Sequence, residues 1–196
     1  MANLTKLMGA IYLSLFLSGC LSIGSGPLTN SISVSSGQIN KKHKLPNGFC
    51  LDRSANSSTA FQETMVVTNC IAVANGNNSY FSRRPVDTIV NISFTKWKIP
   101  KNISQQEYLS GISENMDFKE FLIASSNKKI VYGKRISLSK FFHVDFERIS
   151  SSNRREFVRK YFFLVDKKLV VMTILSLQKP RKNTYIAFEG FIKKLI

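Results

Sequence analysis

The stretch FVRKYFFLV-DKK-LVVMTILSL, residues 157–177, predicts a β-hairpin at the centre of the fold. Both arms are rich in β-branched and aromatic residues, and a compact polar turn at residues 166–168 separates them. The second arm is apolar on both faces over residues 169–175, which is typical of a central strand that is covered on both sides. We therefore expect an antiparallel sheet with this hairpin in its interior.

Further strands and two helices complete the predicted domain. The alternation of apolar and polar residues predicts strands over residues 65–73, 87–94 and 142–147. Ser104 followed by Glu107 is the pattern of a capping box, which predicts the start of a helix. Residues 185–195 place their large apolar side chains on one stripe, which predicts a closing helix that packs on the sheet. The fold class is therefore α+β, an antiparallel sheet covered by helices as an α/β/α sandwich.

Residues 20–44 differ in composition from the rest of the chain. Residues 21–40 are rich in Ser, Gly and Asn without an apolar period, and the basic tetrapeptide KKHK at residues 41–44 follows them. This composition predicts a flexible tether over residues 20–44. A single folded domain is expected over residues 45–196.

Cys20 closes the tetrapeptide Leu17-Ser18-Gly19-Cys20, directly after a short apolar run. A basic start, a hydrophobic middle and small residues before the cut form a secretory signal, and with this Cys residues 1–19 resemble a bacterial lipoprotein signal peptide. The resemblance implies cleavage before Cys20, a diacylglyceryl group on its thiol and acylation of the new amine, for example with palmitate. Leu21, and not Asp, follows Cys20, and in such signals this favours the outer membrane, with the domain facing the periplasm.

Cys50 and Cys70 are the two remaining cysteines. Export places them in an oxidising compartment, which favours a disulfide that would contribute on the order of 3 kcal/mol by closing a short loop. Two buried free thiols are the alternative, and a metal pair is a second one that no nearby His or Cys-x-x-Cys motif supports.

Positive charge is concentrated in the C-terminal part of the chain. The whole chain has a formal net charge of +16, and residues 128–196 hold 17 basic against 5 acidic residues. Such a region attracts anionic partners, which in an envelope lipoprotein are anionic lipid, lipopolysaccharide or an envelope protein and not nucleic acid. The alternative is a lysine-rich composition with solvated side chains. The expected anion-binding residues are Arg83, Arg84, Arg154, Arg155, Arg159, Lys179, Arg181 and Lys182, with exposed turns as the alternative interpretation.

The C-terminal hairpin, with Pro180 and the amphipathic segment 186–196 after it, resembles the ending of the Mog1/PsbP-like fold. Residues 45–50, LPNGFC, are similar to the turn before the first strand of that fold. Residues 50–53 together with Cys70 also resemble uncharacterised alphaproteobacterial lipoproteins. The Mog1/PsbP resemblance implies an antiparallel sheet sandwiched by helices and a role in binding or assembly, and it implies no active site.

The residues available for catalysis are few. His143, Asp145 and Glu147 alternate along one predicted strand whose wet face would carry all three. They could form a general base or hold a divalent metal, although one His and two acids on an exposed strand face are usually solvated and paired with Lys or Arg. No serine-hydrolase, zinc-protease, phosphate-loop or dinucleotide motif is present. We expect no metal site and no cofactor.

These observations predict a lipid-anchored envelope protein with a non-catalytic binding or assembly role, which it performs through its basic C-terminal half. One alternative is an envelope hydrolase with a site near His143 and Asp145. Another is a purely structural lipoprotein whose charge only reflects composition.

Overall fold

The computed structural model describes residues 29–36, 39–74, 87–114, 129–138 and 140–196. Cys20 and the predicted signal peptide, as well as Arg83 and Arg84, lie outside the described residues. The described elements are β1 (Ser31–Ser36), β2 (Ile39–Lys44), β3 (Phe49–Ser58), β4 (Gln62–Asn69), α2 (Cys70–Ala74), β5 (Thr88–Thr95), α3 (Gln105–Glu114), β6 (Lys129–Leu138), β7 (Phe141–Ile149), β8 (Arg155–Val165), β9 (Lys168–Ser176) and α5 (Lys182–Leu195).

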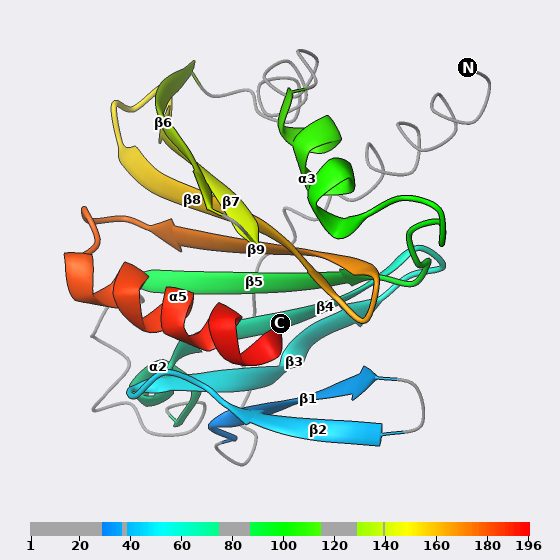
Figure 1. The fold of residues 1–196 in the computed structure, drawn as a ribbon. Coiled ribbons are helices and arrows are strands. Elements are labelled where there is room, and N and C mark those ends of the chain that lie inside the picture. The colour runs from blue at the N-terminus through cyan, green and yellow to red at the C-terminus, as the bar shows by residue number, and fades with distance from the viewer. Residues whose placement is uncertain (1–28, 37–38, 75–86, 115–128, 139) are drawn as a thin grey trace.

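Seven of these strands form one antiparallel sheet in the order β3-β4-β5-β9-β8-β7-β6 (Figure 1). The fold is therefore α+β, as the sequence predicts. The hairpin β8–β9 lies in the interior of the sheet, and its turn residues Asp166 and Lys167 both have positive φ, 48° and 62°. Two such residues in succession give the turn that matches the twist of antiparallel strands.

The two faces of the sheet carry separate apolar clusters. One cluster joins Val90, Met172 and Phe163 of the sheet to Phe188 and Ile192 of α5, and Figure 1 shows α5 lying across this face. Strand β9 contributes Met172 to this face and Leu169 to the other, because successive residues point to opposite sides. The prediction that this strand is covered on both sides is confirmed.

The second cluster lies on the opposite face and joins Leu109 of α3 to Phe142, Phe162 and Leu164. The rings of Phe142 and Phe162 stack at 4.7 Å between centroids. Helix α3 therefore packs on the face that α5 leaves open.

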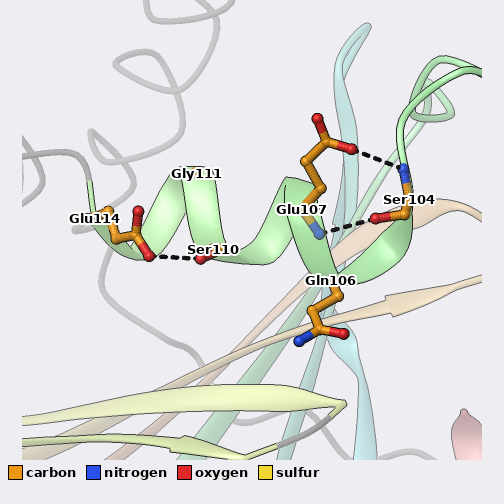
Figure 2. A pocket seen from close by; sticks show the side chains of 6 residues that line it. All are labelled: Ser104, Gln106, Glu107, Ser110, Gly111 and Glu114. Atoms are coloured by element: carbon orange, nitrogen blue, oxygen red, sulfur yellow. Dashed lines mark hydrogen bonds between the residues drawn. The ribbon is translucent and has the colours of Figure 1, made fainter.

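Helix α3 begins with the predicted capping box (Figure 2). The backbone N–H of Glu107 donates to Oγ of Ser104 at 3.1 Å, and the N–H of Ser104 donates back to Oε2 of Glu107 at 3.5 Å. Two N–H groups that have no partner inside the helix are thus satisfied, which fixes where the helix starts.

Residues 31–44 do not form the predicted flexible tether. They form the antiparallel hairpin β1–β2. Ile32 and Val34 are 1% and 6% exposed and belong to the α5-side core. The backbone N–H of Leu51 donates to the carbonyl of Thr29 at 2.8 Å, which fixes the start of the hairpin against β3. Two buried apolar residues among serines and lysines are too few for a periodicity argument, and burial against other elements decides the conformation.

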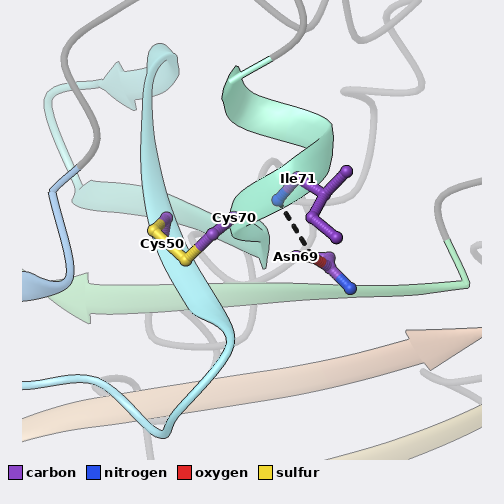
Figure 3. The surroundings of a disulfide bond; sticks show 4 residues. All are labelled: Cys50, Asn69, Cys70 and Ile71. Carbon is purple, nitrogen blue, oxygen red and sulfur yellow. Dashed lines mark hydrogen bonds between the residues drawn. A yellow bond between two sulfur atoms is a disulfide. The ribbon is translucent and has the colours of Figure 1, made fainter. Parts of the chain in front are cut away.

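The strand predicted over residues 65–73 ends earlier than expected. Strand β4 stops at Asn69, and Cys70 is the first residue of the short helix α2. Asn69 accepts a hydrogen bond from the backbone N–H of Ile71 at 3.0 Å through its side-chain oxygen (Figure 3). An Asn that binds the backbone two residues ahead favours a turn over a continuing strand.

No helix among the described residues is long and apolar enough to cross a membrane.

Candidate functional site: a basic surface at one end of the sheet

The register of β8 and β9 brings two of the predicted basic clusters to one end of the sheet. Phe157 pairs with Ser176, so the start of β8 lies beside the end of β9. Arg154 precedes β8 and Arg155 is its first residue, while residues 179–181 follow β9 and Lys182 begins α5. We call the exposed residues gathered here the sheet-end surface, and they are Arg154, Arg155, Lys179, Arg181 and Lys182.

The start of α5 adds to the positive potential of the sheet-end surface. Arg181 is the N-cap residue and makes no side-chain capping bond, and the first turn of α5 contains no acidic residue. The N-terminus of a helix carries about half a positive charge and usually attracts acidic residues. Here it is surrounded by cations instead, an arrangement that an anion would stabilise.

All five acidic residues of residues 128–196 form ion pairs, which leaves most of the sheet-end surface unpaired. The pairs are Asp166–Lys98, Glu156–Arg148, Glu147–Arg155, Asp145–Arg159 and Glu189–Arg159. Arg155 is held only loosely, at 3.5 Å from Glu147 and with its side chain 65% exposed. Arg154, Lys179, Arg181 and Lys182 have no acidic partner among the described residues.

Arg159, another of the predicted anion-binding residues, lies apart from this surface and is paired inside the fold. Its guanidinium donates to both carboxylate oxygens of Asp145, at 2.6 and 2.7 Å, and its side chain is only 14% exposed. It also stacks on the ring of Tyr185 in α5, with 3.7 Å from Cζ to the ring centroid. Strand alternation places Arg159 on the face that α5 covers, so its charge holds the helix to the sheet.

The same cluster extends through Tyr161 to α5. The hydroxyl of Tyr161 donates to Oε1 of Glu189 at 3.1 Å and accepts from Arg159 at 3.3 Å. Burial alone would lower the pKa of Arg159, but its hydrogen bonds to Asp145 and Tyr161 raise it above the ordinary value. Burial also raises the pKa of Tyr161, against the effect of Arg159. Both groups therefore keep their protons over the physiological range, and neither is a general base.

His143 also lies on the α5 side of the sheet, where the wet face was predicted. The residue is 3% exposed, its ring lies 5.2 Å from that of Tyr161, and neither ring nitrogen has a hydrogen-bond partner. Burial and the charge of Arg159 lower the pKa of His143, while Asp145 and Glu189 partly oppose this shift. The prediction of an exposed strand face is wrong, because α5 covers it.

The predicted trio of His143, Asp145 and Glu147 is not grouped to hold a metal ion. The two carboxylates are paired with Arg159 and Arg155. In the part of the chain that the structure describes, no three His, Cys, Asp or Glu side chains are grouped to hold a metal ion.

Lys160 is a lysine with a lowered pKa, which the sequence alone does not predict. It lies on the α3 side of β8, between the core residues Val158 and Phe162. Burial and the nearby charge of Arg148 lower its pKa to about 8. A mixed run of aromatic and basic residues along β8 gives no sign of this, because the sequence does not show how much of the α3 face is covered.

Cys50 and Cys70 form the predicted disulfide (Figure 3). It joins the start of β3 to the start of α2 across 20 residues, with 4.7 Å between the Cα atoms. A thiol in a disulfide is neither a nucleophile nor a metal ligand, so these two residues have a structural role.

The hollow beside α3 offers no comparable site. Its two carboxylates are used within the helix, Glu107 in the capping box and Glu114 as acceptor from Ser110 at 2.6 Å (Figure 2).

No protein-family model matches the chain, and no curated protein is significantly similar to it.

Proposed function

We propose that the protein is an envelope lipoprotein, anchored through Cys20, whose folded domain binds an anionic partner through the sheet-end surface and catalyses no reaction. The partner is an anionic lipid, the phosphates of lipopolysaccharide or an acidic surface of an envelope protein. The outer membrane, facing the periplasm, is the proposed location, because Leu21 follows the lipidated Cys.

The observation that carries this proposal is the group of exposed cations around the uncapped start of α5. A composition effect would scatter lysines on the surface, whereas three of the five cations here are arginines, whose forked donors suit phosphate and carboxylate groups. Of the five acids in residues 128–196, only Glu147 pairs with this surface, at 3.5 Å from Arg155, and the other four pair with Lys98, Arg148 and Arg159.

The finer description of the fold supports a binding role. With α5 on one face of the sheet and α3 on the other, we propose an α/β/α sandwich of the kind that the resemblance to the Mog1/PsbP-like fold implies. The buried His143 and the paired Asp145 leave the hydrolase alternative without an exposed acid–base pair.

Vesicle binding tests the sheet-end surface. Residues 21–196, oxidised and without lipid, are sedimented with vesicles of neutral lipid, anionic lipid or lipopolysaccharide over a series of salt concentrations. We expect binding to the anionic vesicles alone, with a steep loss as salt rises, because salt screens charges at a surface.

A matched pair of charge reversals locates the effect. Arg154→Glu with Arg181→Glu should abolish binding, whereas Lys101→Glu with Lys140→Glu, the same change in charge near the opposite end of the sheet, should weaken it only slightly. Equal losses for the two double variants would mean that net charge and not this surface is responsible.

Anchoring is tested separately. Cys20→Ala should move the full chain from the membrane fraction to the soluble fraction or leave it as an uncleaved precursor.

A further inference from the structure

The hairpin β1–β2 and the strands β3–β4 enclose a groove of about 370 Å³ at the edge of the sheet opposite β6. The hairpin contributes Ser31, Ser33 and Lys42 to its lining, Thr29 precedes the hairpin, and β3–β4 contribute Leu51, Arg53, Glu63 and Met65. Strand geometry agrees with this lining: Ser33 pairs with Lys42 across the hairpin, and Leu51 and Arg53 alternate onto one face of β3.

Three charges face this groove without neutralising one another. Lys42, Arg53 and Glu63 are exposed, and none of them forms an ion pair with any residue that the structure describes. The groove therefore offers two cations and one anion at separate points of its wall. Ser31 and Ser33 add hydroxyl-bearing side chains to the lining, and Leu51 and Met65 supply apolar surface.

This distribution fits a ligand that carries a negative and a positive group on one short frame. A simple anion would meet Lys42 and Arg53 but would be repelled by Glu63. A phosphodiester with a primary amine satisfies all three charges, because its phosphate accepts from the cations and its ammonium donates to the carboxylate.

The position of the groove suggests the source of such a ligand. Eight residues lie between Cys20 and Thr29, and the nine Cα–Cα steps from one to the other span at most about 32 Å when fully extended. If Cys20 is lipidated as proposed, the groove stays close to the bilayer surface. Tethering raises the local concentration of headgroups to the millimolar range or above, so a weak, open site can still be occupied.

We propose that the groove between β1–β2 and β3–β4 binds an amine-bearing phosphodiester headgroup of the phosphoethanolamine type. Lys42 and Arg53 hold the phosphate, and Glu63 selects for the amine. This proposal rests on the proposed lipid anchor for the source of its ligand, but it concerns different residues from the sheet-end surface.

Titration of ¹⁵N-labelled residues 21–196, which include every described residue, with glycerophosphoethanolamine tests the groove directly. We expect shifts of the amide resonances of Ser33, Arg53 and Glu63. Lys42→Glu should weaken binding about fivefold to tenfold, as expected for the loss of one exposed ion pair and the gain of a repulsion. Lys101→Glu, an equal change of charge at a distant exposed position, should leave it unchanged.

Selectivity for the amine is the sharper readout. Glycerophosphoglycerol has the same phosphodiester without the amine and should bind more weakly to the wild type, while Glu63→Gln should bind the two compounds equally. Absence of groove shifts at the highest soluble concentration, or equal weakening by Lys42→Glu and Lys101→Glu, would overturn the proposal. Equal binding of both compounds by the wild type would overturn the role of Glu63.

The source of the ligand is decided with the lipidated chain in nanodiscs. Groove shifts in phosphatidylethanolamine but not in phosphatidylcholine would support a membrane headgroup, and shifts with the free compound alone would overturn that source. The titration uses residues 21–196 and does not depend on lipidation of Cys20, so its result stands even if the proposed anchor is refuted. Charge reversal at the sheet-end surface should not change binding in the groove. The two proposals can therefore fail independently.

Discussion

The ion pair between Asp145 and Arg159 should be worth more to the fold than any exposed pair of the domain. Two short hydrogen bonds, of 2.6 and 2.7 Å, join the side chains, which are 30% and 14% exposed. Hydrogen bonds to charged groups contribute about 1.5–3 kcal/mol, and breaking a fully buried pair costs about 3–5 kcal/mol. Because this pair is only partly buried, we expect a coupling free energy of about 2 kcal/mol.

A double-mutant cycle measures this coupling. Asp145→Ala, Arg159→Ala and the double variant are unfolded in urea, and the transition is followed by the fluorescence of Trp97, the single tryptophan, and by circular dichroism. The double variant should be destabilised by less than the sum of the single variants. Some compensation remains in Asp145→Ala, because Glu189 still lies 3.5 Å from the guanidinium.

The pair between Lys98 and Asp166 is the internal control. Its contact distance of 3.0 Å is also short, but its side chains are 51% and 27% exposed. Exposed pairs contribute about 0–1 kcal/mol, so the coupling here should be at most half of that at Asp145–Arg159. Equal coupling in the two cycles would refute the reasoning that burial gives the α5-side pair its value.

Three further predictions concern stability in urea. Burial lowers the pKa of His143 below 6.5 in the folded state, so the unfolded state takes up this proton first as the pH falls, and the folded state loses stability below pH 6.5. When the pH is lowered from about 7.5 to 5, the free energy of unfolding of His143→Leu should therefore fall by less than that of the wild type. Replacing both Cys50 and Cys70 with Ala should cost about 3 kcal/mol and lower the midpoint of unfolding, as reduction of the wild type should also do. Lys167→Gly should raise the free energy of unfolding by about 1 kcal/mol, since Lys167 has φ of 62°, and a neutral or negative effect would contradict strain in this turn.

The sequence predicts the interior of this fold well because its signals there are local. The hairpin β8–β9 has two uninterrupted β-rich arms and a polar turn, and the capping box of α3 needs only Ser104 and Glu107. In both cases the residues that determine the structure are close neighbours in the chain. The disulfide is predicted by a different argument, because only Cys50 and Cys70 remain once Cys20 is assigned to the proposed lipid anchor.

The predictions that fail depend on contacts between distant segments. Ile32 and Val34 become core residues only because α5 and β3 lie against the hairpin, and nothing within residues 31–44 indicates this. His143 and Arg159 look exposed in an alternating strand, and they are buried because α5 returns across this face. Periodicity identifies the two faces of a strand, but it does not say what covers each face.

The choice between functional and compositional charge depends on where the acids are used. The C-terminal region has 17 basic and 5 acidic residues, and the structure pairs every one of those acids. Asp145 and Glu189 both pair with Arg159, which attaches α5 to the sheet, so these two carboxylates do not neutralise the sheet-end surface. A cluster of cations next to an uncapped helix start disfavours the isolated domain, because like charges repel and the helix terminus adds to the repulsion. Such an arrangement is stabilised when an anionic partner is present, and this is the physical reason to seek the partner at Arg154, Arg155 and Arg181.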